Sequence, residues 1–497
     1  MKYCAAIDLG TTNIKCAVFE LAVGPDNEPR LDSDRFTPDS GAELRLIDLS
    51  EAECGLIYPS AEETEQDAAA WWDIICSMLS RAAASYDIGS VCVSSQGISV
   101  VPVDREFMPL GNAISWLDRR DAAESGGIFG VISPERYLEI TARVSPAMYA
   151  ASKISWIIRN NKEIAAKTHK YLMPLDYITA RLCGSAVTDH SMAAGTAAYD
   201  MRGRKWSPEI LGYYNIDVSM LPVIQNSGTV AGYATGEAAA QTGLKPGTII
   251  AVGAQDQKCG ALGAGLRFGA ATLSMGTAFA LTVKLDKLRR AENGFIPVFA
   301  DISGDGYAWE SCINTGGAAL QWCAGLFGDG YGAVNSLAAG YKPYANSPLF
   351  IPHLSGCGHP RMYADASGGF YGLKLGDDKA AMYYSVMEGV AFTLRQNINE
   401  VINAGLNPDL IYAFGGGARS DAWLQIIADI TGVEISAMDI RDAPCAGAAI
   451  LAARAYGVPA AGYRNEARRA FKPRAEKQPL LKLRYEKYNG LEKKFFG

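Results

Sequence analysis

Short apolar runs separated by polar or glycine-rich stretches dominate the pattern of hydrophobic positions along this chain. Such runs are typical of buried strands, and they lie at residues 3–7, 16–19, 90–93, 248–252, 279–283 and 411–414. Between them, apolar residues recur at helical spacing, most clearly at Trp423, Ile426, Ile427 and Ile430. The alternation of strands with helices predicts an α/β protein.

The length of 497 residues is too great for one ordinary hydrophobic core, so two large domains are expected. A glycine-rich stretch at 228–246 marks the expected boundary, which gives domains at 1–246 and 247–497. The polar stretch 24–50 contains three prolines and several acidic residues, and it is expected to be a loop.

Composition and charge exclude several function classes. Hydrophobic residues make up 49% and charged residues 20% of the chain, as in a soluble globular protein. A net charge of −7 argues against nucleic acid as a partner. No apolar run reaches the ~18 residues of a membrane helix, and the first ten residues do not resemble a signal peptide. The eleven cysteines form no C-x-x-C pair, so we expect free thiols and a cytoplasmic location.

Asp256 is the first candidate catalytic residue. It follows the apolar run 248–252 and Gly253, and the small residues after it predict a helix packed closely on a sheet. Asp256 is therefore expected at a strand end and a helix start, facing the crevice where α/β sheets bind ligands. A carboxylate there can accept a proton from a substrate hydroxyl during phosphoryl transfer. The alternative is that Asp256 only caps the helix.

A glycine-threonine turn near the N-terminus is the first candidate phosphate site. Asp8, Gly10, Thr11 and Thr12 lie between two apolar runs, which predicts a β-hairpin. The glycine allows close approach of a ligand, and the amides and hydroxyls of the turn can hold phosphate oxygens. Asp8, at the strand end, can hold Mg²⁺ through water. A plain hairpin without a ligand is the alternative.

Two polar corners in the first half are typical of a small-molecule site. One is the Ser-Ser-Gln-Gly stretch that follows the run 90–93 and contains Gln96. In the other, Asp118 and an arginine can hydrogen-bond vicinal hydroxyls, and Trp116 can lie against the C–H face of a sugar. For this second corner, a surface salt bridge is the alternative that the residues alone favour.

The second half repeats the strand, glycine-threonine turn, strand plan. Gly276 and Thr277 lie between apolar runs in the same way as the first turn, which suggests two similarly built domains. Residues 314–322 indicate a helix opened by glycines. Three glycines at 415–417 join a strand to a helix, which permits close backbone approach to a ligand.

Two other features give weaker signals. His353, Cys357 and His359 suggest a metal, but their spacing fits no common zinc pattern and they lie in a glycine- and proline-rich stretch. The tail 464–494 mixes basic and acidic residues, which favours a solvated helical face over a nucleic-acid patch.

Taken in order, these motifs resemble those of the FGGY carbohydrate kinase family, which includes xylulose, gluconate and glycerol kinases. The resemblance runs from Ile7 to about Gly457, which is most of the chain. Its most specific parts are IDLGTT, SWLDRR, the Asp256 segment, SMGTA, TGGAALQW and FGGGARSDAWLQIIADITG. Shorter agreements lie at residues 65–72, 176–178 and 188–191.

The resemblance implies two actin-like (ribonuclease H-like) domains with ATP, Mg²⁺ and a sugar in a central cleft. The first domain would carry the sugar side and the second the nucleotide side with the catalytic aspartate. Asp256 would be the general base on the sugar hydroxyl and Asp8 the metal-linked acid. The implied phosphate contacts are Gly10, Thr11, Thr12, Gly276 and Thr277. The implied nucleotide contacts are Gly317, Gln321, Gly417 and Asp421, and the implied sugar contacts are Gln96, Trp116, Asp118 and Arg120.

One departure from the family pattern bears on the substrate. After Ser-x-Gln, xylulose kinases typically show Met-His and this chain has Gly97 and Ile98, while the Arg-Glu of glycerol kinases is also absent. A ketopentose such as xylulose is the first expectation, and another ketose, a polyol or a sugar acid stays open. A nucleotide-dependent sugar sensor of the same fold that transfers no phosphate is the alternative of another class. A homodimer is left open as the assembly.

Overall fold

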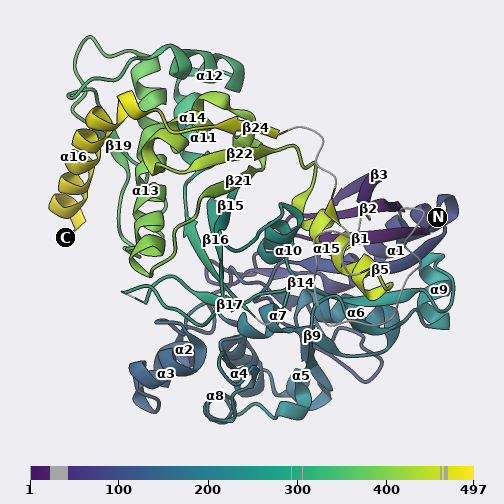
Figure 1. Cartoon of the computed structure of the whole chain (residues 1–497). Helices are drawn as coiled ribbons and strands as arrows, with labels where there is room; N and C mark the ends of the chain where they lie inside the picture. The colour runs from purple at the N-terminus through teal and green to yellow at the C-terminus, as the bar shows by residue number, and fades with distance from the viewer. Residues whose placement is uncertain are drawn as a thin grey trace. The chain divides into compact units, whose positions relative to one another are not determined.

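A computed structural model describes residues 2–22, 43–292, 294–304, 306–458, 462–463 and 468–496 (Figure 1). Part of the stretch predicted as a loop, residues 24–42, lies outside the described residues. The rest of that prediction was wrong, because β3 (Glu43–Glu53) is a strand. Its polar side chains do not prevent this, since β2 (Asn13–Ala22) supplies an antiparallel ladder and most of the β3 side chains face solvent or lie half-buried.

The chain divides into two compact units. Unit 1 holds residues 1–263, 299–307 and 442–464, and unit 2 holds residues 264–298, 308–441 and 465–497. The division thus falls after Gly263 and not at the predicted 246/247 boundary. The reason is that β14 (Ile249–Gln255) pairs in parallel with β5 (Ile88–Ser95), which makes it a strand of the first sheet. Asp256 therefore belongs to unit 1.

Unit 1 is built on a seven-stranded sheet with the order β13-β14-β5-β1-β2-β3-β23. The strands β1 (Lys2–Leu9) and β2 form the predicted hairpin, with Asp8 opposite Lys15. Parallel pairing of β1 with β5 and of β5 with β14 brings three carboxyl ends to one edge of the sheet. The outer strands are β13 (Val230–Tyr233) and β23 (Gly462–Tyr463).

Most of a second seven-stranded sheet, with the order β17-β18-β16-β15-β21-β22-β24, lies in unit 2, while Phe299 and Ala300 of β17 belong to unit 1. The strands β15 (Ala270–Met275) and β16 (Phe279–Leu285) form a second antiparallel hairpin, as the repeated turn predicted. The sheet strands are completed by β17 (Val298–Ala300), β18 (Tyr307–Ile313), β21 (Leu410–Phe414), β22 (Glu434–Met438) and β24 (Arg468–Phe471). The central five strands of both sheets share one order, β3-β2-β1-β5-β14 and β18-β16-β15-β21-β22, which is the repeated actin-like arrangement.

Helices complete both units. The longer helices of unit 1 are α1 (Ala68–Ser85), α4 (Ala150–Asn160), α6 (Pro174–Cys183) and α15 (Ala443–Ala455). The shorter ones are α2 (Ala122–Gly126), α3 (Pro134–Thr141), α5 (Lys162–Lys167), α7 (His190–Ala194), α8 (Pro208–Tyr214), α9 (Gly236–Thr242) and α10 (Asp256–Gly263). Unit 2 has α11 (Gly317–Phe327), α12 (Tyr331–Gly340), α13 (Lys379–Asn403), α14 (Asp421–Thr431) and α16 (Gln478–Phe496).

Short strand pairs lie outside the two large sheets. In unit 1 they join β4 (Glu65–Gln66) to β7 (Ala113–Ile114), β6 (Val101–Val103) to β8 (Lys170–Leu172), β9 (Val187–Asp189) to β12 (Val223–Gln225) and β10 (Tyr199–Asp200) to β11 (Lys205–Trp206). In unit 2, β19 (Leu349–Ile351) pairs with β20 (Gly369–Tyr371). The β4–β7 pair matters for function, because it brings Gln66 beside the corner that contains Trp116.

The sequence predicted that the small residues of α10 pack closely on the sheet. In the structure they pack mainly against α15 instead. A side-chain carbon at Gly447 would lie 1.9 Å from Cys259 O, and one at Gly263 would lie 2.3 Å from Ala443 O. The backbones of the two helices can touch only because these positions have no side chain. This contact holds α10, and with it Asp256, in a fixed place in unit 1.

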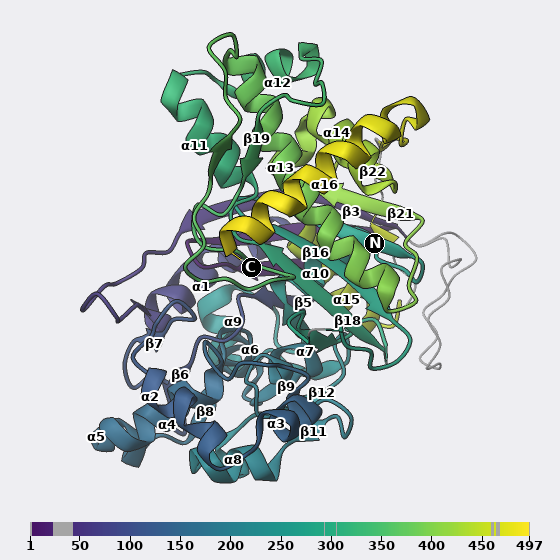
Figure 2. The same cartoon turned by 90° about the vertical axis from the view of Figure 1, so that its left-hand side faces the viewer.

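The basic tail forms α16, and Figure 2 shows this yellow helix lying against α13. Its outer face is solvated as predicted, but its inner face is not. Arg484 and Glu388 have side chains with 0% exposure and form a buried ion pair, and Arg484 also donates to backbone oxygens of residues 344, 347 and 348. The charged tail can therefore pack as a helix against the core of unit 2, because Arg484 is paired with Glu388.

Other sequence expectations concern cysteines and membranes. All eleven cysteines are free thiols, as predicted. Among the residues that the structure describes, no helix is both long and apolar enough to cross a bilayer.

Asp176 in the first turn of α6 gives unit 1 a measurable pH dependence. Its carboxylate accepts a hydrogen bond from Met173 N at 3.0 Å, and burial raises its pKa from 3.8 to about 8. Because the folded state holds this proton more tightly than the unfolded chain, stability falls as pH rises from about 4 to about 8. We expect Asp176→Asn to gain stability relative to the wild type between about pH 5 and about pH 8, measured by urea unfolding.

The matched control for this prediction is Asp73→Asn, at an exposed position of α1. This variant should follow the wild type at every pH. A constant difference in unfolding free energy between Asp176→Asn and the wild type would contradict the prediction.

Candidate functional site

Three predicted site residues lie where the parallel strands of unit 1 end. Asp8 is the second-to-last residue of β1, Gln96 follows β5, and Asp256 follows β14. Gln96 N donates to Leu9 O at 2.8 Å, which joins two of these strand ends directly. Because these strands are parallel neighbours, their polar ends form one edge, the usual ligand edge of such a sheet.

Asp256 begins α10 and is half-buried. Its Oδ1 accepts hydrogen bonds from Gln257 N at 2.6 Å and from Gln255 Nε2 at 2.5 Å. One of these donors is the backbone amide of the next residue, whereas a capping side chain accepts from the amide two or three residues further on, so this contact does not make Asp256 the cap of α10. The second donor is the side chain of its neighbour, which a simple cap does not require.

Asp8 is 7% exposed and accepts a hydrogen bond from Ser94 Oγ at 3.0 Å. Burial raises the pKa of Asp8 well above its usual range, and the negative charges of Asp442 and Asp256 raise it further. Lys15 opposes this effect with its positive charge. Three carboxylates thus share one electrostatic environment, and their oxygen donors suit a hard divalent cation such as Mg²⁺.

Lys15 and Asp442 belong to this site, and the sequence reasoning missed both. Lys15 Nζ contacts Asp442 Oδ2 at 2.7 Å, and Asp442 also caps α15 by accepting from Cys445 N at 2.9 Å. Although burial lowers the pKa of Lys15, the contact with Asp442 raises it to about 12. Asp442 is far from Asp8 in the chain, so no local motif could have indicated it.

The first glycine-threonine turn and the sugar corners share hydrogen bonds at Thr11. The Thr11 hydroxyl donates to Gln96 Oε1 at 3.1 Å and accepts from Trp116 Nε1 at 3.0 Å. Gly10 N closes the turn by donating to Asn13 O at 3.0 Å. The residue expected at the phosphates therefore contacts two residues expected at the sugar.

Gln66 completes this arrangement and was not singled out from the sequence. It is fully buried, donates through Nε2 to Thr11 O at 2.8 Å, and accepts from Gln96 Nε2 at 2.9 Å. Its place within the stretch 65–72, which resembles the family, was the one signal that could have indicated it.

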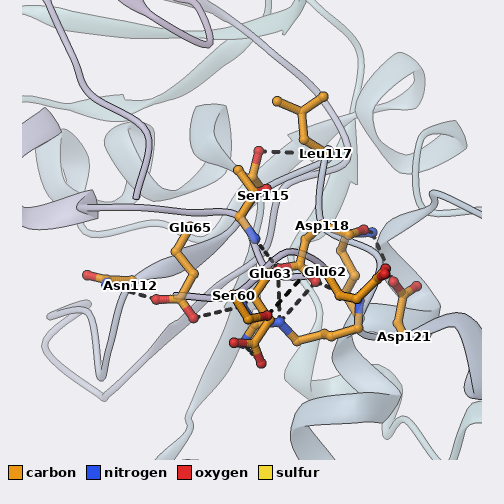
Figure 3. A network of polar contacts seen from close by, with 12 residues as sticks. Ser60, Glu62, Glu63, Glu65, Asn112, Ser115, Leu117, Asp118 and Asp121 are labelled. Carbon is orange, nitrogen blue, oxygen red and sulfur yellow. Dashed lines mark hydrogen bonds and ion pairs between the residues drawn. The ribbon is translucent and has the colours of Figure 1, made fainter. Parts of the chain in front are cut away.

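Asp118 and Arg120 form an ion pair of 2.8 Å, but it is buried and not the surface salt bridge that was the alternative. Figure 3 shows Asp118 within a network of polar contacts. Asp118 is 2% exposed and also accepts from Thr64 N at 2.7 Å. Arg120 reaches Glu65 at 2.8 Å and lies 5.0 Å from the centre of the Trp156 ring. These contacts hold the corner that carries Trp116 and occupy much of the hydrogen-bonding capacity of Asp118.

The corner after β5 contains a strained turn. Ser99 N donates to Gly97 O at 2.9 Å across Ile98, whose φ is +74°. A β-branched residue with positive φ costs roughly 1–3 kcal/mol, and such strain gathers at ligand sites. This turn places the half-buried Ile98 at the position where the chain departs from the xylulose kinase pattern.

Unit 2 contains a cavity of about 440 Å³ at the second glycine-threonine turn. It brings together two of the predicted phosphate contacts, Gly276 and Thr277, with three of the predicted nucleotide contacts, Gly317, Gln321 and Gly417. It is also lined by residues that were not among the predicted contacts: Met275, Leu320, Tyr331, Asn335, Gly416, Arg419, Ser420 and Trp423. Ser420 and Asn335 are joined by a hydrogen bond of 2.7 Å, which ties α12 to the start of α14.

Close backbone contacts build the floor of this cavity. Gly317 N donates to Gly276 O and Ala318 N donates to Thr277 O, each at 3.0 Å. A side-chain carbon at Gly317 would lie 2.4 Å from Gly276 O, and one at Gly417 would lie 3.0 Å from Met275 Cβ. Only glycine allows these loops to approach so closely, and the result is a shallow backbone-lined surface beside the N-terminus of α11.

Asp421 is the predicted nucleotide residue that does not line this cavity. Its exposed carboxylate pairs with Arg469, and it lines a separate cavity on the other side of α14. The helical spacing explains the difference, since Ser420 and Trp423 face one side of α14 while Asp421 and Gln425 face the other.

The histidine and cysteine residues set aside as metal ligands are only partly brought together. His353 and Cys357 lie beside Glu492 of α16, with their ligand atoms within 4.8 Å, while His359 accepts from Cys312 N elsewhere. Glu492 already contacts His353 at 2.9 Å, Arg361 at 3.4 Å and Tyr488 at 3.3 Å. The cluster is thus a satisfied network that anchors α16.

Comparison with known proteins adds an independent result. The N-terminal domain of the FGGY family of carbohydrate kinases matches residues 42–263, and the C-terminal domain of that family matches residues 271–456. The gluconokinase of Bacillus subtilis is 27% identical over 470 residues, covering 92% of this chain and 88% of its own. The xylulose kinase of the same organism is 27% identical over 469 residues, covering 92% and 89%.

A solved structure gives the same result for the fold. The xylulose kinase of Rhodospirillum rubrum superposes with a TM-score of 0.86, at 24% identity and 99% coverage of both chains. This likeness supports the two actin-like units. The equal identity to relatives with different substrates leaves the acceptor to be decided by the residues at the carboxyl edge of unit 1.

Proposed function

Because the chain belongs to the FGGY family of carbohydrate kinases and is an ATP-dependent carbohydrate kinase, we propose that it phosphorylates a ketopentose such as xylulose. The observation that carries this proposal is the hydrogen-bonded group at the carboxyl edge of unit 1. There Thr11 of the phosphate turn contacts both Gln96 and Trp116, beside the carboxylates of Asp8 and Asp256. These residues combine acceptor binding with a base and a phosphate-binding turn.

Asp256 is the proposed general base. Phosphoryl transfer needs little covalent help from the enzyme, and its main demands are positioning and charge compensation. A carboxylate at the acceptor hydroxyl takes its proton as the oxygen attacks the γ-phosphorus. The half-buried position of Asp256 at the start of α10 leaves it accessible to such a hydroxyl.

The cavity of unit 2 is the proposed nucleotide site. Gly276 and Thr277 would face phosphate oxygens, with the N-terminus of α11 and Gly317 beside them. Tyr331 and Leu320 offer apolar surface for the adenine, and Gln321 and Gly417 complete the wall. Asp421 would support the loop that precedes α14, because it pairs with Arg469, which donates to Ala418 O of that loop at 2.8 Å.

Asp8 is the proposed residue for Mg²⁺, with Asp442 beside it. Mg²⁺ supplies charge compensation for the triphosphate when it is bound. The mutual repulsion of Asp8, Asp442 and Asp256 makes this edge of the sheet favourable for a cation. Lys15 would hold Asp442 in place beside this site, through its contact of 2.7 Å.

Gln96 and Trp116 are the proposed sugar contacts. Trp116 uses its one N–H to bind Thr11, and the face of its ring remains for the sugar. Gln96 binds Thr11 through Oε1 and Gln66 through Nε2, so the second N–H of its amide remains for the acceptor. Asp118 and Arg120 would contribute by holding the corner in shape, because their charges are paired internally. A sugar acid such as gluconate is the second candidate, since a gluconokinase matches the chain as well as a xylulose kinase does.

The test is a panel of ketoses, polyols and sugar acids in a coupled ADP-release assay, with the phosphorylated product identified by mass spectrometry. We expect xylulose to give the highest kcat/KM and a stoichiometric sugar phosphate. A higher kcat/KM for gluconate would replace the ketopentose by the second candidate. Sugar binding without any sugar phosphate would favour a sensor and contradict the proposal.

A further inference from the structure

The side chain of Gln255 occupies a defined place beside Asp256. Gln255 is the last residue of β14, and its backbone N donates to Ser191 Oγ at 3.1 Å. Its side chain lies over Gly97, where an added side-chain carbon would be 3.3 Å from Gln255 Cγ. The missing side chain at Gly97 therefore makes room for the glutamine.

The amide of Gln255 lies between an anion and a cation. Its Nε2 donates to Asp256 Oδ1 at 2.5 Å, and its Oε1 accepts from Lys258 Nζ at 3.5 Å. A carboxylate only accepts hydrogen bonds and an ammonium only donates them, so each charged group selects one end of the amide. In the reverse orientation, the amide NH₂ would face the ammonium of Lys258, which also only donates. The amide oxygen would face the carboxylate of Asp256, which also only accepts.

Lys258 is itself held in place. It is 3% exposed, and its Nζ lies 3.9 Å from the centre of the Phe299 ring, in a cation–π contact within unit 1. A buried lysine packed on an aromatic ring has few alternative positions. Its charge therefore acts on Gln255 from a constant direction.

We propose that Gln255 is a positioning residue for the general base, and that Lys258 fixes the orientation of the Gln255 amide. This inference rests on the proposed role of Asp256. The Gln255 amide and Gln257 N both donate to Asp256 Oδ1, so together they restrain rotation of the carboxylate. A base held at one angle meets the acceptor hydroxyl with little reorganisation, which affects turnover more than acceptor binding.

The experiment compares Gln255→Met with Gln255→Glu, using the best acceptor of the panel. The methionine keeps the length of the side chain but cannot donate, and we expect kcat to fall about tenfold to a hundredfold while KM for sugar and ATP changes less than about threefold. The glutamate places a second carboxylate against Asp256, and we expect a larger fall in kcat. Gln225→Met, in β12 of the same unit, should match the wild type.

Lys258 variants test the second part independently. Lys258→Met should lower kcat, and Lys258→Arg, which keeps the charge and the donor, should restore most of it. A merely structural lysine would instead change the melting temperature and leave the ratio of kcat to KM unaltered.

Three outcomes would overturn this inference while leaving the proposed function intact. These are a Gln255→Met enzyme with wild-type kcat, a loss confined to the sugar KM, and crystal structures in which the Asp256 side chain has the same orientation with and without the glutamine. The crystal structures need no acceptor, so they test the positioning role of Gln255 without any assay of turnover. If the wild-type enzyme phosphorylates no sugar of the panel, that result contradicts the proposed function. The crystal structures still show whether Gln255 sets the orientation of the Asp256 side chain.

Discussion

Replacing Asp256 by asparagine is expected to lower kcat for sugar phosphorylation by about 10²–10⁴-fold, because general-base catalysis contributes on that order. Asparagine has nearly the shape of aspartate and can still accept from Gln257 N and from Gln255 Nε2. It is almost without basicity, so the loss would report the proton transfer and not the packing of α10. Steady-state kinetics with the best acceptor give kcat, and titration with a non-hydrolysable ATP analogue should show unchanged nucleotide affinity.

The matched control is Asp378→Asn, at the start of α13. Asp378 is a helix cap whose side chain accepts from Ala381 N at 3.0 Å, and it belongs to unit 2. If Asp256 were only a cap, both variants would show the small stability change typical of caps and no kinetic defect. Full sugar-dependent ADP release by Asp256→Asn would remove Asp256 from the mechanism.

Replacing Gly317 by valine is expected to weaken ATP binding by about tenfold to a hundredfold or more. Overpacking a closely packed contact costs typically 1–3 kcal/mol, and each 1.4 kcal/mol is a factor of ten in affinity. A side-chain carbon at this position would lie 2.4 Å from Gly276 O, so the second turn and α11 must move apart. Isothermal titration calorimetry with the ATP analogue measures the effect.

Gly325→Ala is the control in the same helix. A side-chain carbon there meets nothing within 4 Å, so this variant should bind ATP normally and stabilise α11 by about 0.5–1 kcal/mol. Normal affinity in Gly317→Val would show that the cavity at the second turn is not the nucleotide site.

Several parts of the fold and of the site were predictable because their signals are local. The hairpin of β1 and β2 follows from two apolar runs joined by a glycine-threonine turn, and the hairpin of β15 and β16 follows from the repeat of that pattern. Asp256 was placed correctly at the end of a strand and the start of a helix. In such cases a few neighbouring residues decide the backbone conformation, and the pattern is visible in a short window.

Other assignments depended on pairings that no short window contains. The polar stretch 43–53 became β3 because β2 offers it a ladder, and β14 joined the first sheet because β5 lies beside it. Asp421 was expected at the nucleotide, but the helix that it begins turns its side chain toward Arg469.

The sequence by itself determined which residue types stand at the strand ends and where glycine permits close approach. Only the tertiary structure decided that Gln66 is hydrogen-bonded to Thr11, that Asp442 lies near Asp8, and that Gln255 lies between Asp256 and Lys258. The physical reason is that hydrogen bonds and charges act over a few ångströms in space. Residues that are hundreds of positions apart, such as Asp8 and Asp442, come within that range only when strands and helices have packed.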